Sequence, residues 1–203
     1  MTNRATTEVV VHGLRDLLGT SLVTALAVHG FDVTAAEPST DRSGIVLVDL
    51  DVPGCAHVVD RAARSGWVVI GLAGDETRLA AAIAAGASGY FPKSGPLGEL
   101  SDLLDDAAAG RQVMHPTERD RLWSVHRASE SEREAWAERL KSLSSREYEV
   151  LQLLDQGLRA VDVAERLVLS IATVRTHIQR MLNKLEAGSQ ERAVTIYRAM
   201  VDR

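Results

Sequence analysis

Residues 143–186 read LSSREYEVLQLLDQGLRAVDVAERLVLSIATVRTHIQRMLNKLE, a stretch that predicts three short helices in succession. Ser144 followed three residues later by Glu147 is typical of a capping box, in which side chains bond the free backbone N–H groups of a helix start. Gly157 is expected to end the first helix, and Ser170 to begin the third. The stretch therefore predicts a small trihelical unit.

The third predicted helix has one apolar side and one basic, polar side. The apolar side, at helical spacing, consists of Val174, Ile178, Met181, Leu182 and Leu185. The opposite side carries Arg175, Thr176, Gln179, Arg180 and Lys184. A helix of this kind, supported by two others, is what a helix-turn-helix places in the major groove of DNA.

The same stretch resembles the four-helix DNA-binding domain of LuxR/NarL-type transcription regulators, aligned without a gap. Many positions agree in register from Leu143 to about Met200. Two positions depart from the pattern: Ala160 stands where the family often has Asn, and Ala172 where it often has Gly. The resemblance implies a DNA-binding transcription regulator, and the alternative is a helical domain that only binds protein.

We expect the exposed side of the third helix to recognise double-stranded DNA in two ways. Arg175, Thr176 and Gln179 are predicted to meet base edges, because Arg suits guanine and Gln suits adenine in the major groove. Contacts to phosphates fix the register of the protein on the duplex. The predicted phosphate contacts are Thr173, His177, Arg180 and Lys184.

A further helix is predicted over about Gln190–Val201, where Val194, Tyr197 and Val201 recur at helical spacing. In the family that the chain resembles, this helix is the dimerisation element of the DNA-binding domain. The resemblance therefore implies a homodimer that binds an inverted-repeat operator.

The first half of the chain alternates strands with helices. The predicted strands are 8–12, 31–36, 45–49, 67–72 and 89–91, and the predicted helices are 16–29, 56–64, 76–85 and 97–109. Strands that are nearly continuous in Val, Ile and Leu indicate a parallel sheet covered on both faces. We therefore predict an α/β fold, a flavodoxin-like doubly wound sheet of five parallel strands, followed by an all-α four-helix helix-turn-helix domain.

The crossover between the second and third strands is short. Residues 37–44 offer eight residues, whereas a helical crossover takes a dozen or more. The second helix of the fold is therefore expected to be missing or reduced to a turn. One apolar face of the sheet is then expected to be partly uncovered and open to a ligand or partner.

Two segments resemble the receiver domains of response regulators. VLVDLDVPG at 46–54 is similar to the phosphorylation-site strand, and AAGASGYFPKS at 84–94 is similar to the fifth strand. The resemblance places Asp49 at the phospho-acceptor position, Lys93 at the phosphate-contacting position and Tyr90 at the position of the switch aromatic.

The same region lacks the side chains that a receiver needs for phosphorylation. His12 and Gly13 stand where a receiver carries the acids that hold Mg²⁺, and Ala73 where it carries a Ser or Thr for the phosphoryl group. We predict no metal and no cofactor, and control without ordinary phosphorylation, with Asp49 and Lys93 kept as an ion pair. The alternatives are a regulator that binds a small-molecule metabolite in this pocket and an ordinary regulator phosphorylated by a sensor kinase.

The predicted domains are a receiver-like domain over 1–110, a helical linker over 111–141 and a helix-turn-helix domain over 142–203. The linker is charged, but Trp136, Leu140 and Leu143 form an apolar seam that is expected to pack on a domain or on a second subunit.

Charge is distributed unevenly over the 203 residues, whose net charge is −5. Residues 1–110 hold 7 Lys and Arg against 14 Asp and Glu, whereas residues 142–203 hold 9 against 8. The acidic excess therefore lies in the first half, away from the third helix. The sequence contains a single cysteine, and it has neither a signal-peptide core nor a long apolar run. We therefore predict a cytoplasmic protein without a membrane contact. No catalytic set of side chains is indicated, so we do not expect an enzyme.

Overall fold

The computed structural model describes residues 7–14 and 17–201. The chain divides into two compact units, Met1–Ala128 and Ser129–Arg203. This division falls inside one helix, α5 (Pro116–Lys141), so the domain boundaries at 110 and 141 stay a prediction. The predicted helix start at Asp16 lies outside the described residues. Residues 1–6, which entered the prediction that there is no signal peptide, also lie outside them.

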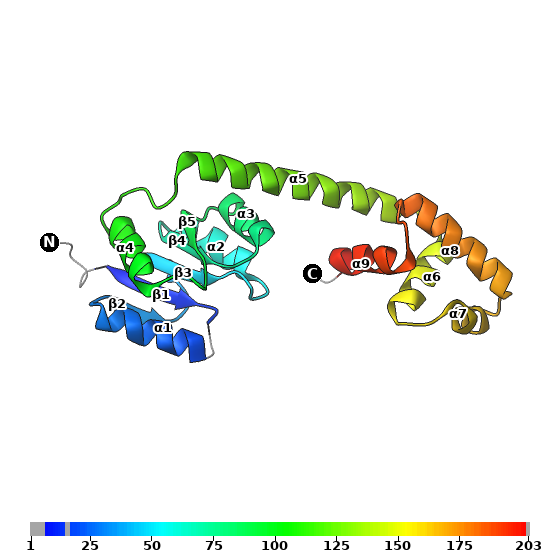
Figure 1. Cartoon of the computed structure of the whole chain (residues 1–203), viewed down its shortest axis with the longest axis horizontal. Helices are drawn as coiled ribbons and strands as arrows, with labels where there is room; N and C mark the ends of the chain where they lie inside the picture. Colours follow the sequence, from blue (N-terminus) through cyan, green and yellow to red (C-terminus); the bar gives the residue numbers. More distant parts are fainter. Residues whose placement is uncertain (1–6, 15–16, 202–203) are drawn as a thin grey trace. The chain divides into compact units, whose positions relative to one another are not determined.

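The first unit is a parallel sheet with helices on both faces (Figure 1). Its strands are β1 (Glu8–His12), β2 (Asp32–Ala35), β3 (Ile45–Asp49), β4 (Val68–Leu72) and β5 (Gly89–Phe91), in the order β2-β1-β3-β4-β5. Its helices are α1 (Leu17–Val28), α2 (Cys55–Arg64), α3 (Glu76–Ala84), α4 (Leu97–Ala108) and the first part of α5. The predicted doubly wound α/β fold is confirmed.

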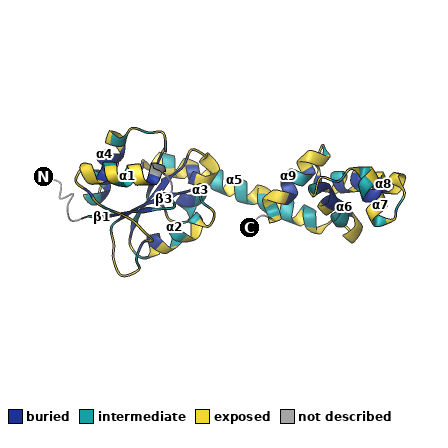
Figure 2. Cartoon of the chain, turned by 90° about the horizontal axis from the view of Figure 1, so that it is seen from below, coloured by how far each residue is buried: buried dark blue, intermediate teal, exposed yellow. Residues whose placement is uncertain are grey.

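Alternate residues of the strands belong to two separate hydrophobic cores, one on each face of the sheet. Val10, on β1, belongs to a buried cluster with residues of α2 and α3, whereas its neighbours Val9 and Val11 belong to one with residues of α1 and α4. All five residues of β3 are buried, which is why the middle of the sheet is dark in Figure 2. The carboxyl ends of the strands lie at one edge of the sheet, because all pairs are parallel.

Residues 36–44 join β2 to β3 without a helix, as the short crossover predicts. The expectation of an uncovered apolar face is wrong. Trp67 is only 4 % exposed in the same cluster as Val10, and its Nε1 donates to the Ser39 carbonyl at 2.8 Å. Thr34, paired in register with Val10, is exposed. The uncovered part of this face is therefore polar.

The second unit contains the end of α5 and four shorter helices. These are α6 (Ser145–Asp155), α7 (Ala160–Leu167), α8 (Ile171–Leu185) and α9 (Gln190–Val201). The predicted capping box is present: the Ser144 hydroxyl accepts from the Glu147 N–H at 3.3 Å, and the Glu147 carboxylate accepts from the Ser144 N–H at 2.8 Å. The four-helix helix-turn-helix fold is confirmed.

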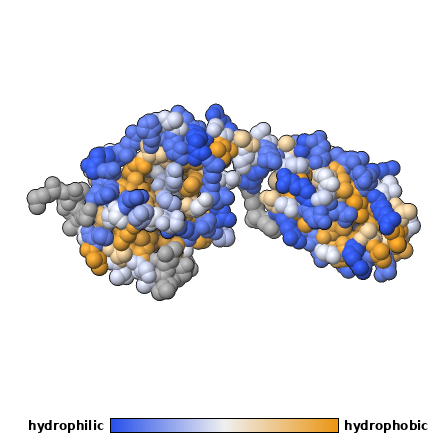
Figure 3. Space-filling view, in the orientation of Figure 1, coloured by the Kyte–Doolittle hydropathy of each residue, from blue (hydrophilic) through white to orange (hydrophobic). Residues whose placement is uncertain are grey.

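On the visible face of each unit, hydrophilic side chains alternate with smaller apolar patches (Figure 3). Within the described part of the chain, no helix combines the length and apolarity of a bilayer span.

Candidate DNA interface and receiver-like pocket

Helix α8, orange in Figure 1, is fixed in its unit by one buried side. Ser170 begins it by accepting the Thr173 N–H at 3.1 Å. The buried residues of the helix are Val174, Ile178, Met181 and Leu185. Leu182 is half-buried against the same core. The packing of this side on the core determines which side of α8 faces solvent.

The exposed side of α8 carries the predicted base-reading residues. Arg175, Thr176 and Gln179 are all exposed. The Thr176 hydroxyl donates to the Ala172 carbonyl at 3.0 Å, and the Gln179 amide donates to the Asn183 side chain at 3.0 Å. This bond uses one of the two N–H donors of the Gln179 amide, so the second donor and the carbonyl oxygen remain for reading adenine. The two contacts lie within the helix, so they leave the exposed side of α8 accessible.

The four predicted phosphate contacts differ in their surroundings. Thr173 and Arg180 are exposed, and neither Arg175 nor Arg180 has an ion pair among the described residues. His177 is half-buried, and its Nδ1 atom is buried without a hydrogen-bond partner in the described structure. A phosphate contact by His177 therefore has to use Nε2.

Lys184 has a structural partner that the sequence did not reveal. Its Nζ atom lies 2.7 Å from the Glu147 carboxylate and donates to the Ser142 carbonyl at 3.0 Å. Glu147 is 4 % exposed. Burial would raise the pKa of this carboxyl, but the hydrogen bonds from Lys184 and Ser144 outweigh burial and hold the pKa below its usual value. An ammonium group has three donors, so Lys184 keeps one for a phosphate.

The predicted dimerisation residues do not form one exposed stripe. Tyr197 is 7 % exposed, packs edge-on against Tyr148 with ring centroids 5.8 Å apart, and its hydroxyl accepts from Gln152 at 3.4 Å. Val194 is half-buried, and Val201 is 51 % exposed. The expectation that Tyr197 is an accessible contact is therefore wrong, because the ring belongs to the core of its own unit.

The receiver-like pocket contains a cluster of four charged side chains at the carboxyl ends of the strands. Lys93 Nζ lies 2.5 Å from Asp49 and 2.6 Å from Asp51, and Arg78 lies 2.7 Å from Asp51. The Asp51 N–H also donates to Asp49 at 2.9 Å. Asp49 is 6 % exposed. The predicted ion pair of Asp49 with Lys93 is present, and it is part of a larger cluster of two carboxylates and two cations.

The pKa values follow from this pairing. The hydrogen bond from Lys93 holds the pKa of Asp51 below its usual value. Burial would lower the pKa of Lys93, but its bonds to Asp49 and Asp51 outweigh burial and raise it. Both net shifts favour the charged forms of Asp51 and Lys93, so the charges of the cluster compensate one another near neutral pH.

Arg78 was missed in the sequence because it lies 27 residues from Asp51 and on another element. It stands in the first turn of α3, where the Asp75 carboxylate accepts the Arg78 N–H at 2.9 Å. The N-cap thus fixes the backbone from which the guanidinium reaches Asp51. The signal in the sequence was Asp51, a second carboxylate two residues after Asp49. Two carboxylates so close together indicate that more than one cation lies near them.

The described residues do not fit the Mg²⁺ of receiver domains. Gly13 has φ +93°, a conformation that side chains rarely adopt, and a Cβ there would lie 3.0 Å from the Asp49 Cβ. Ala73, 1 % exposed, offers no hydroxyl. Both carboxylates of the cluster are already paired, and residues 7–14 and 17–201 contain no group of three His, Cys, Asp or Glu that could hold a metal ion.

Tyr90, at the switch position, bonds to the first part of α5. Its hydroxyl lies 3.1 Å from the Glu118 carboxylate, and Arg121 pairs with both Glu118 and Glu76. Burial, followed by the negative charge of Glu118, raises the pKa of Tyr90. Leu122 is fully buried beside these residues. The switch position is therefore held by the helix that follows the receiver-like fold.

An α/β unit of receiver type and a helix-turn-helix unit together define a DNA-binding response regulator. The family described as "Bacterial regulatory proteins, luxR family" matches residues 141–197. The nitrate/nitrite response regulator protein NarL of Escherichia coli K12 is 31% identical over 165 residues, which cover 77% of this chain and 74% of NarL. The chain belongs to the LuxR/NarL family of response regulators, which are transcription regulators of two-component systems and not enzymes.

Two further relatives cover more of the chain. The transcriptional regulatory protein YxjL of Bacillus subtilis 168 is 29% identical, over 85% of this chain and 81% of that protein. The solved structure of response regulator ChrA, from a heme-sensing two-component system, is 26% identical and covers 96% of this chain and 98% of its own, with a TM-score of 0.47.

Proposed function

We propose that the exposed side of α8 reads DNA in the major groove, with Arg175, Thr176 and Gln179 at base edges. The observation that carries this proposal is the separation of the two sides of α8: the apolar row is buried, and these three residues are exposed on one helix. Positioning contacts to phosphates come from Thr173, His177 and Arg180, and from the remaining donor of Lys184. We infer a cytoplasmic protein from this proposed DNA target.

We further propose that two copies bind an inverted-repeat operator. Val201, exposed on the last turn of α9, and the half-buried Val194, seven residues before it, are apolar residues that this helix can offer to a partner. Sedimentation of the full chain on operator DNA tests the stoichiometry. Two chains per duplex are expected, and one chain per duplex would contradict the proposal.

The DNA interface is tested by comparing two arginines of the same helix. An operator is first selected from random duplexes with the wild-type chain. Arg175→Ala is then expected to weaken specific binding by about 1–3 kcal/mol and to relax the preference at one base position. Arg180→Ala, the matched control, is expected to weaken all sequences alike and to reduce the salt slope by about one unit. Identical effects of both variants on every operator variant would contradict the division of roles.

For control, we propose that this regulator does not use ordinary phosphorylation of Asp49. A phosphoryl group at Asp49 adds negative charge where Lys93 is already shared by two carboxylates. The hydroxyl that binds the group in receivers is replaced by Ala73. The alternatives are a metabolite bound in the charged pocket around Asp49 and phosphorylation by a sensor kinase.

Intact-mass spectrometry after treatment with acetyl phosphate and Mg²⁺ tests the mode of control. No phosphoryl group is expected on the wild type, and Asp49→Asn is expected to leave operator affinity nearly unchanged. A stoichiometric gain of one phosphoryl group that is absent in Asp49→Asn would show an ordinary phosphorylation switch.

A further inference from the structure

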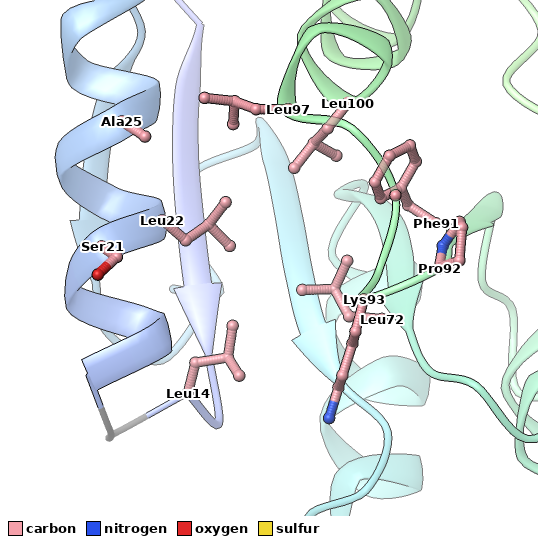
Figure 4. Close-up of a pocket in the computed structure, with 11 residues that line it drawn as sticks. Leu14, Ser21, Leu22, Ala25, Leu72, Phe91, Pro92, Lys93, Leu97 and Leu100 are labelled. Atoms are coloured by element: carbon pink, nitrogen blue, oxygen red, sulfur yellow. The ribbon is translucent and has the colours of Figure 1, made fainter.

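The first unit contains an apolar cavity beside the charged cluster, with a volume of about 240 Å³. It lies between α1 and α4, at the ends of β4 and β5 (Figure 4). Leu22 projects from α1 toward the strands, and Leu97 projects from the start of α4 toward α1. Leu72 and Phe91, the last residues of β4 and β5, complete the walls. The cavity thus lies at the strand ends, where open α/β sheets bind their ligands.

Small residues keep the cavity open. Ala25 and Ser21 line it from successive turns of α1, where larger side chains would occupy the space. Gly95 lines the opposite side, and a Cβ at this residue would lie 2.5 Å from the Phe91 ring. The ring of Phe91 therefore lies against the backbone of Gly95. The wall atoms lack the packing contacts that a filled core provides, so an apolar occupant gains contacts with them.

We propose that this cavity binds a small, neutral and mostly apolar molecule of the size of one ring or two fused rings. An engineered apolar cavity of about 150 Å³ binds benzene, so this volume admits a somewhat larger molecule. Among the described residues of the walls, no charged side chain is free of an ion pair. Lys93 is the cation that lines the cavity, and its Nζ is paired with Asp49 and Asp51, so it does not attract an anionic ligand. The exposed Ser21 hydroxyl stands at the solvent side, where it can bond one polar group of the ligand.

Two residues of the cavity wall connect it to the charged cluster. Lys93 lines the cavity and holds Asp49, and Leu72 is paired in register with Asp49 across β3 and β4. A molecule in the cavity therefore touches the residues that fix Asp49. A ligand in the cavity thus has a direct route to the charged cluster, and its use as an input in place of phosphorylation rests on the proposed function.

Binding is tested on the full chain with indole as the neutral probe and benzoate as the anionic one. Saturable methyl chemical-shift changes on adding indole, together with a higher melting temperature, are expected for the wild type. Benzoate is expected to bind more weakly. Ala25→Phe fills the cavity and is expected to weaken indole binding at least about tenfold. Ala27→Phe, an exposed position on the same helix, is the matched control and is expected to bind as the wild type does.

Ser21→Leu narrows the cavity from its exposed side and tests the same point if Ala25→Phe fails to fold. Equal indole binding by the wild type and either filling variant would overturn the proposal, as would preferential binding of benzoate or the absence of saturable binding. These measurements use neither DNA nor a phosphodonor. Their failure is therefore distinguishable from failure of the proposed function.

Discussion

Replacing Lys184 by Met measures how much this side chain stabilises the second unit, apart from any contact with DNA. The substitution removes the ammonium that lies 2.7 Å from Glu147, a carboxylate only 4 % exposed. Hydrogen bonds to charged groups contribute about 1.5–3 kcal/mol, but the Lys184 side chain is 39% exposed and water replaces part of the interaction. We therefore expect the second unit to lose about 1–2 kcal/mol of stability.

Hydrogen–deuterium exchange of peptides from α6 and α8 measures this loss in the intact chain. A double-mutant cycle with Glu147→Gln isolates the coupling between the two side chains. Arg180→Met is the matched control, because Arg180 is exposed on the same helix and has no ion pair in the described structure. If Lys184→Met costs no more stability than Arg180→Met, the ion pair does not stabilise the unit and the reasoning is refuted.

The same pair gives a pH dependence with a definite sign. The pKa of Glu147 is lowered in the folded protein, so its contribution to stability is present above the unfolded pKa, about 4.3. The contribution is lost as the pH falls through the folded pKa. Glu147→Gln is therefore expected to flatten the acid side of the stability curve for the second unit.

Two further predictions concern the cores of the units. Leu122→Ala, at a fully buried position on α5, is expected to destabilise the first unit by about 2–5 kcal/mol in urea denaturation, and Trp123→Ala, on the exposed side, by less. Tyr197→Asp is expected to unfold the second unit, since it buries an unpaired charge, whereas Val201→Asp is expected to keep the fold and weaken only the dimer on DNA. Circular dichroism distinguishes the last two variants, and a folded Tyr197→Asp would contradict the burial of the ring.

The sequence was sufficient for the fold because the signals that determine it are local. Alternation of strands and helices predicted the parallel sheet, and the Ser144–Glu147 spacing predicted the helix start that the structure shows. Partners distant in sequence were not accessible in this way. Arg78 reaches Asp51, and Lys184 reaches Glu147, from other elements of the fold.

Two narrower expectations, that Tyr197 is accessible and that the short crossover leaves an apolar face uncovered, were wrong for a different reason. Helical spacing identifies one apolar side of a helix but does not say whether that side meets its own unit or a second copy. In α9 the side carrying Tyr197 packs against α6, through Tyr148 and Gln152. Likewise, a short crossover predicts a missing helix but does not show that Trp67 is buried in this core and bonded to the crossover at Ser39.

The receiver-like pocket differs from receiver domains in its backbone as well as in its side chains. A single substitution is therefore not expected to restore the Mg²⁺ site. Gly13→Asp would return a carboxylate to the position that binds Mg²⁺ in receivers. However, Gly13 has φ +93°, and the new Cβ would lie 3.0 Å from the Asp49 Cβ and 3.3 Å from a Val52 methyl group. A side chain in this conformation costs about 1–3 kcal/mol, and the added carboxylate would also repel Asp49.

We therefore expect Gly13→Asp to melt at a lower temperature than the wild type and to remain unmodified by acetyl phosphate. Gly13→Ala is the matched control, because it introduces the same backbone strain and the same Cβ contact without the charge. The difference in melting temperature between the two variants measures the repulsion from Asp49. If Gly13→Asp instead gains a phosphoryl group in the presence of Mg²⁺, the backbone at Gly13 adapts to the side chain, and the missing acid alone accounts for the departure from receiver chemistry.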